Sequence, residues 1–126
     1  MSDIRANTIS DASGTGPIEL YKQSAAKAWV QFKGTSTVVI EGSQHVSNVV
    51  DNGTGDYTVN LTNSFSNTNY AYAGMGGQNT TSLVCVTQPR NLTAPTVSSI
   101  KHQTARIDAT LVDPRVVSII YHGDLA

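Results

Sequence analysis

The stretch VSNVVDNGTGDYTVNLT, residues 46–62, contains two strand-like runs on either side of a glycine-rich reversal. In its second half Tyr57, Val59 and Leu61 alternate with polar residues, which is the two-residue period of a strand with one buried face. The sequence DNGTGD between the runs supplies glycine, asparagine and aspartate, which adopt positive φ at little cost. The stretch therefore predicts a β-hairpin.

Two adjacent valines, Val49 and Val50, lie in the first strand of this hairpin and so point to opposite faces. Either a bulge interrupts the strand at this point, or both of its faces are covered. A strand covered on both faces needs a neighbour. We therefore predict that Val49 and Val50 belong to a subunit interface.

Short runs of the same kind fill most of the remaining chain, and no run has the period of a helix. They lie at 26–33, 35–41, 70–74, 82–88, 96–102, 104–111 and 116–122. This pattern predicts an all-β domain, an antiparallel β-sandwich of about eight short strands, with a barrel-like closure as the alternative. The last run, VVSIIYH, is apolar nearly throughout, so we expect it to be central with both faces covered.

The run at 26–33 alternates, with Ala28, Val30 and Phe32 on one face and Trp29 on the other between two lysines. If the first face is the core, Trp29 points outward. An outward tryptophan is an exposed apolar side chain in a lone domain, so it indicates a covering neighbour or arm. The reversed register, with Trp29 in the core, is the other interpretation. We predict Trp29 as a third interface residue.

Residues 1–24 form a distinct opening segment, an extended N-terminal arm, before the β-domain at 25–126. The apolar residues of the arm are separated by polar ones and by the turn cluster SGTGP, so it has too little apolar surface to fold alone. It is either a disordered tail or an arm that orders on another subunit. The candidate assembly residues in the arm are Ile4, Ile9, Ile18 and Leu20.

The composition excludes several classes of partner. Charged residues make up 13% of the chain and the net charge is −1, so there is no electrostatic footprint for nucleic acid or an anionic membrane. The sequence shows neither a signal-peptide pattern nor an apolar stretch long enough to span a bilayer, which predicts synthesis in a cytosol without membrane insertion. The single cysteine, Cys85, lies in the apolar run LVCV and is expected to be a small core residue.

The sequence contains few patterns that indicate catalysis or metal binding. It contains no nucleophile elbow or P-loop, and His45, His102 and His122 are not at metal-ligand spacing. Asp51 and Asp56 flank the hairpin turn, but neither calcium-loop pattern is present, which favours a turn whose aspartates bond their own backbone. The chain has only two glutamates, so a glycosidase-type pair would need scattered aspartates. We expect no catalytic residue, no cofactor and no metal.

The run YAYAG at 70–74 places Tyr70 and Tyr72 together on one face. Tyrosine rings stack on the C–H faces of sugars, so both residues are candidate contacts for a glycan or another partner. The alternative is that both rings fill the core or an interface.

Several stretches of the chain resemble small virion proteins and tail-fibre domains of tailed bacteriophages, many from aquatic hosts. They are IRANTISDASGTGP at 4–17, QSAAKAWVQFKG at 23–34, DNGTGDYTV at 51–59 and the closing VVSIIYHGD at 116–124. Where those sequences often have NFNG, this chain has QFKG at 31–34. The shared stretches are structural signatures and not catalytic ones.

The resemblance implies a non-enzymatic virion structural protein that is made in the host bacterial cytoplasm. Its leading form is a homotrimeric tail-fibre or tail-tip element, docked through its N-terminal arm on other virion proteins and contacting host cell-surface glycans. One alternative is a capsid decoration or head-fibre protein. A second is an unrelated carbohydrate-binding module or glycan-cleaving enzyme.

Overall fold

The computed structural model describes residues 25–77, 84–89 and 93–126, and these contain no helix. The predicted arm lies outside the described residues. Eight strands follow one another along the chain: β1 (Ala28–Lys33), β2 (Val39–Gln44), β3 (Val46–Gly53), β4 (Asp56–Leu61), β5 (Ala71–Gly77), β6 (Val84–Pro89), β7 (Ser99–Arg106) and β8 (Val116–His122).

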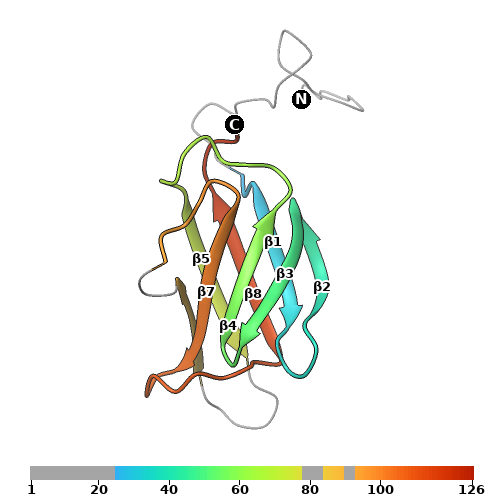
Figure 1. The fold of residues 1–126 in the computed structure, drawn as a ribbon, viewed down its shortest axis with the longest axis vertical. Helices are drawn as coiled ribbons and strands as arrows, with labels where there is room; N and C mark the ends of the chain where they lie inside the picture. Colours follow the sequence, from blue (N-terminus) through green and yellow to red (C-terminus); the bar gives the residue numbers. More distant parts are fainter. Residues whose placement is uncertain (1–24, 78–83, 90–92) are drawn as a thin grey trace, which may run out of the picture.

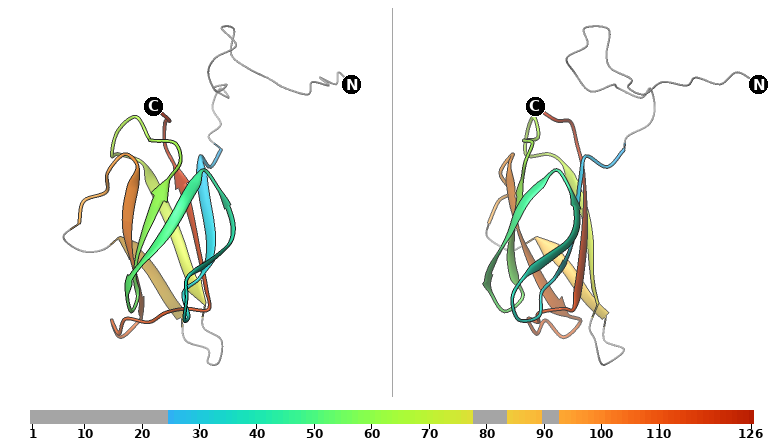
Figure 2. Two further views of the ribbon diagram at one scale, coloured as in Figure 1. Left: turned by 45° about the vertical axis from the view of Figure 1, so that its right-hand side comes forward. Right: turned by 90° about the vertical axis from the view of Figure 1, so that its right-hand side faces the viewer.

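All eight strands belong to one sheet, in the order β2-β1-β8-β5-β6-β7-β4-β3, and all neighbours are antiparallel. The sheet curls until its edge strands β2 and β3 lie next to each other, as Figure 1 and the two turned views in Figure 2 show. The all-β prediction with about eight antiparallel strands is confirmed. The ladder runs unbroken from β2 to β3, so the form is a nearly closed barrel and not two separate packed sheets.

Alternate side chains of the strands point into the barrel. In β1 Ala28, Val30 and Phe32 are buried while Trp29 is exposed, so the predicted alternation of this strand is confirmed. Cys85 is also buried and has a free thiol, as predicted. The core cluster consists of Ala28, Val30, Phe32, Tyr57, Val59, Leu61, Phe65, Tyr70, Ile100, Val117, Ile119 and Tyr121.

The predicted hairpin is formed by β3 and β4, and its turn is fixed at both ends. The Asp51 carboxylate accepts a hydrogen bond from the Gly53 amide at 2.9 Å, which is the predicted use of a turn aspartate. Gly53 and Gly55 both have positive φ. The Gly55 amide donates to Asp113 Oδ1 at 2.7 Å, so the hairpin tip is attached to the segment that precedes β8.

The adjacent valines of β3 do point to opposite faces. Val49 pairs with Val59 and packs against the core, whereas Val50 pairs with Thr58 and is 40% exposed. The irregularities of this ladder lie on either side of the valine pair, so the alternative of a bulge at the pair itself does not hold. Val49 is partly buried on the inner side of the strand, and its predicted interface role stays a prediction. Only Val50 offers an outward apolar side chain.

Three predicted strands differ from the two strands that the structure has in their place. The runs at 96–102 and 104–111 make one strand, β7, because Ile100, His102 and Thr104 continue a single inward alternation. The chain then turns through Ala109, which has a φ of 65°. β2 begins later than predicted because Ser36, with a φ of 63°, belongs to the preceding turn.

The final strand, β8, lies between β1 and β5 near the middle of the sheet order, as predicted. Its inner residues Val117, Ile119 and Tyr121 are buried, but Ser118 and Ile120 on its outer side are exposed. The expected cover on both faces is therefore not provided by the described residues.

Candidate assembly surface

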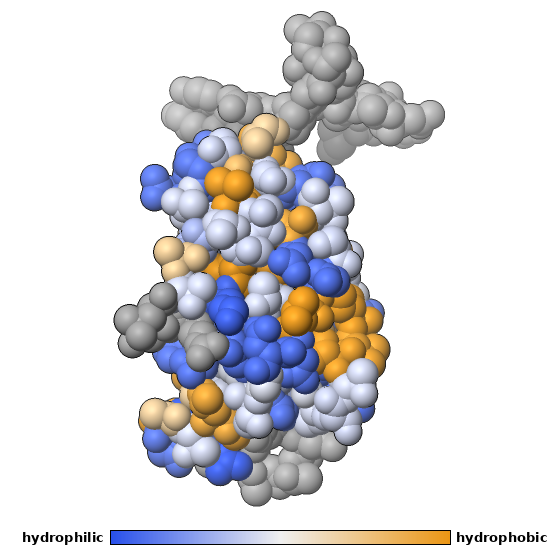
Figure 3. Space-filling model, viewed as in Figure 1, coloured by the Kyte–Doolittle hydropathy of each residue, from blue (hydrophilic) through white to orange (hydrophobic). Residues whose placement is uncertain are grey.

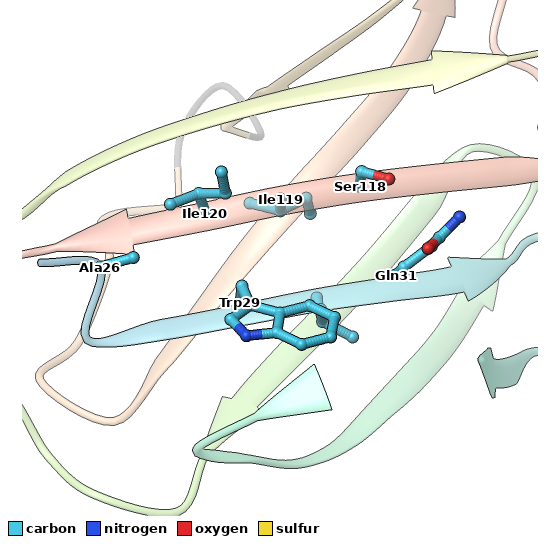
Figure 4. A pocket seen from close by; sticks show the side chains of 7 residues that line it. Ala26, Trp29, Gln31, Ser118, Ile119 and Ile120 are labelled. Atoms are coloured by element: carbon cyan, nitrogen blue, oxygen red, sulfur yellow. The ribbon is translucent and has the colours of Figure 1, made fainter. Parts of the chain in front are cut away.

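A shallow hollow lies on the outside of the barrel where β1 and β8 run side by side. It has a volume of about 200 Å³, and we call it the outer hollow. Figure 4 shows Trp29 and Ile120 on neighbouring strands, with Ala26 at the end where the chain enters β1. The lining residues are Ala26, Trp29, Val30, Gln31, Ser118, Ile119 and Ile120.

The ring of Trp29 lies flat on the outer surface because the neighbouring strand has a glycine beneath it. Trp29 pairs with Gln44 and Gln31 with Gly42, and a Cβ on Gly42 would lie 3.1 Å from Cη2 of the indole. The six-membered ring of the indole therefore lies close to the Gly42 backbone, and the side chain is still 37% exposed. The predicted outward orientation of Trp29 is confirmed, and the reversed register is wrong.

The apolar surface continues from the outer hollow across the sheet. Ile120 of β8 is 45% exposed. It lies between Trp29, its partner on β1, and Ala73, its partner on β5. In the next row Met75, 71% exposed, lies between Ser118 and Val86. The outward side chains of β1, β8, β5 and β6 thus form one mainly apolar face.

A second apolar surface lies at the two edge strands. Val39 of β2 is 50% exposed, Ile40 of β2 36% and Val50 of β3 40%, and we call these three residues the edge patch. Figure 3 shows a broad hydrophobic area on the side of the molecule where Figure 1 places β2 and β3. In the described chain β2 pairs only with β1 and β3 only with β4, so each strand has one edge without a β-ladder. Such edges are sites where another chain can pair.

The sequence predicts only part of these surfaces. Trp29 lies in the outer hollow and Val50 in the edge patch, so the structure separates two residues that were predicted to share one interface. Local alternation identified both. The sequence does not predict the exposure of Ile120, Val39 and Ile40, which follows from the open face of β8 and from the place of β2 at the edge of the sheet.

Tyr70 and Tyr72 lie on the inner side of the sheet. Tyr70 is 6% exposed, its ring stacks on Phe65 at 4.3 Å between centroids, and its hydroxyl donates to the Thr96 carbonyl. Tyr72 is half-buried with its ring edge-on to His102. The alternation of 70–74 placed both rings on one face, but that face is the interior. The predicted sugar-stacking role of Tyr70 is therefore wrong.

Two pairs of buried polar side chains bond across the interior. His102 Nε2 lies 2.7 Å from the Tyr121 hydroxyl, and burial lowers the pKa of His102 to about 4. The Tyr57 hydroxyl donates to Asp113 Oδ1 at 2.8 Å. Burial, followed by this bond to a carboxylate, raises the pKa of Tyr57. These groups stabilise the core and the base of the hairpin, and neither pair opens onto the outer hollow or the edge patch.

Comparison with protein-family models, curated proteins and solved structures finds no match to this chain. Within the described ranges no three His, Cys, Asp or Glu side chains are grouped so as to hold a metal ion. No helix able to cross a membrane occurs in those ranges either. The two apolar surfaces are therefore the features from which a function can be argued.

Proposed function

We propose that this chain is a non-enzymatic structural component of a tailed-bacteriophage virion, a tail-fibre or tail-tip element that assembles with copies of itself. The edge patch is the observation that carries the self-assembly in this proposal, while the virion assignment rests on the sequence resemblance. Val39, Ile40 and Val50 expose apolar surface beside two strand edges that lack a β-ladder in the described chain. Exposed apolar surface and open strand edges together favour contact with another chain.

The edge patch suits a closed ring of subunits. A homotrimer has one repeated contact, in which one surface of each copy meets a different surface of the next. β2 of one copy and β3 of its neighbour are two such surfaces, side by side on every barrel. In this arrangement Val50 of one copy covers Val39 of another, because both side chains lie on the outer side of their strands.

A non-enzymatic role agrees with the chemistry of the interior. The buried histidine is bonded to Tyr121, and the buried Tyr57 hydroxyl is bonded to Asp113. The first pair joins β7 to β8, and the second joins β4 to the segment before β8. A catalytic side chain must be able to contact its substrate, and neither pair lines a hollow on the described surface.

The virion location rests on the resemblance of residues 4–17, 23–34, 51–59 and 116–124 to phage virion proteins. It is tested by mass spectrometry of particles purified from cells that produce this chain. We expect its peptides in the particle at a few to a few dozen copies. Hundreds of copies would overturn the tail assignment in favour of capsid decoration, and absence from intact particles would overturn the virion role.

The anchoring role of the arm has its own test. Deletion of residues 1–24 removes no member of the described core cluster, so the barrel should stay folded. We expect the shortened chain to give an unchanged far-ultraviolet circular dichroism spectrum and to be missing from particles. Normal incorporation of the shortened chain would show that the arm is not the anchor.

A further inference from the structure

The outer hollow begins where the N-terminal arm joins the barrel. Ala26 lines the hollow and precedes β1 by two residues, so the preceding chain starts at the rim of the hollow. The segment GPIELY at 16–21 precedes Ala26 by only a few residues in the sequence. In an extended chain Ile18 and Leu20 project to the same side, because side chains alternate with a period of two.

We propose that residues 17–22 of the same chain fold back over β1 and fill the outer hollow, with Ile18 and Leu20 against Trp29 and Ile120. This inference concerns the single chain and holds whether or not the protein belongs to a virion. It leaves residues 1–16, with Ile4 and Ile9, for contact with another protein.

The reach of the segment fits the length of the hollow. An extended chain advances about 3.3 Å per residue, so Leu20 and Ile18 lie at most about 20–26 Å along the chain from Ala26. β1 has six residues and is therefore about 20 Å long. A segment that reverses near Ser24 and runs back along β1 can place both apolar side chains anywhere along the strand.

The chemistry of the hollow also fits this segment. Most of its lining is apolar, from Ala26, Trp29 and Ile120, while Gln31 and Ser118 stand at the far end from the entry of the chain. Ile18 and Leu20 supply aliphatic surface to the open face of the indole. A tether this short gives an effective concentration on the order of millimolar, which favours docking within one chain over binding between chains.

Trp29 reports directly on this docking, because it is the single tryptophan of the chain. Its emission maximum and its quenching by acrylamide are compared in the full-length protein and the variant Ile18→Ser/Leu20→Ser. We expect a red-shifted emission and a larger quenching constant in the variant, at all protein concentrations. The matched control Ile4→Ser/Ile9→Ser alters the same arm equally but should behave as the unmodified chain.

Equal quenching in the full-length protein and the Ile18→Ser/Leu20→Ser variant would overturn the proposal. Circular dichroism and urea unfolding confirm that each variant keeps its barrel. The described barrel contributes every member of the core cluster, so serine at 18 and 20 should leave it intact.

A disulfide test separates docking within one chain from exchange between copies. Ile18→Cys is combined with Ile120→Cys, an exposed position that tolerates the change, while the native Cys85 stays buried. We expect oxidation to give a cross-linked monomer of increased mobility on a non-reducing gel. A cross-linked dimer would overturn docking within one chain and place the segment on a second copy, and no cross-link at all would overturn docking altogether.

Discussion

Tyr57 connects three segments that are far apart in the sequence. Its hydroxyl donates to Asp113 Oδ1 at 2.8 Å and lies 3.4 Å from the Gly34 carbonyl, while its ring meets Phe32 edge-on. The Gly34 amide in turn donates to the Pro114 carbonyl at 2.9 Å. The end of β1, the start of β4 and the segment before β8 are thereby fixed to one another. This contact leaves no room for a side chain at Gly34.

Replacement of Gly34 by alanine should therefore destabilise the barrel. The new Cβ would lie 2.5 Å from the Tyr57 hydroxyl and 2.9 Å from the Pro114 carbonyl oxygen. Overpacking of this kind costs about 1–3 kcal/mol, measured as the free energy of unfolding in urea. Gly77→Ala is the matched control, because a Cβ there meets nothing within 4 Å. Similar losses in the two variants would contradict this account of Gly34.

His102 makes stability depend on pH. Its pKa falls from the usual 6.5 to about 4 because burial disfavours the charged ring. Between these two values the unfolded chain binds more protons than the folded one, so stability falls as the pH is lowered through this window. The full loss below the folded pKa is about 3 kcal/mol.

The measurement is urea unfolding of the wild type and His102→Gln at pH 7 and pH 5. We expect the wild type to lose more stability than the variant at the lower pH. The exposed His122→Gln control should lose as much as the wild type. An identical pH dependence in wild type and His102→Gln would show that the buried ring is not responsible.

At the scale of the element, β8 has one buried face and one open face. Ile119 is 1% exposed and its neighbour Ile120 is 45% exposed. Truncation of a buried isoleucine leaves a cavity, so Ile119→Ala should cost about 2–5 kcal/mol in unfolding free energy. Ile120→Ala should cost clearly less, and it should also increase the quenching of Trp29. Equal destabilisation by the two substitutions would contradict the assigned faces of β8.

The strands that could be predicted from sequence are those in which local alternation and turn residues agree. The β3–β4 hairpin and β1 are of this kind, since glycines mark their ends and the apolar period is two. The sequence predicts two strands in place of β7, because Gln103 separates two apolar runs. In the structure the inward residues Ile100, His102 and Thr104 continue across this position. A buried histidine counts as polar in any local pattern, and only its bond to Tyr121 explains its place.

The surfaces were harder to predict than the strands. The outward position of Trp29 follows from the alternation of β1 alone, but the outer hollow also needs the pairing of Trp29 with Ile120, which is a long-range contact. Tyr70 and Tyr72 share a face as predicted, yet nothing local to 70–74 indicates that this face is the interior. Which side of a strand meets the core is decided by the whole sheet.

In the whole molecule, the barrel buries its core cluster but leaves large apolar side chains exposed on its outside. The edge patch leaves Val39 and Val50 exposed beside the two strand edges. Lysine at both positions should keep the fold, because neither side chain belongs to the core cluster, and should prevent the proposed trimer from forming. Sedimentation velocity of Val39→Lys/Val50→Lys checks this, with Ile107→Lys as a control at a site that is 79% exposed and remote from the patch. An unchanged sedimentation coefficient in the double variant would place the contact elsewhere.

The mass of the full-length chain in solution shows directly whether this barrel assembles into a homotrimer. Multi-angle light scattering on a size-exclusion column gives that mass without assumptions about shape. We expect a species of three times the chain mass of 13.4 kDa, stable on dilution to micromolar concentration. A stable particle of 13.4 kDa under the same conditions would contradict it.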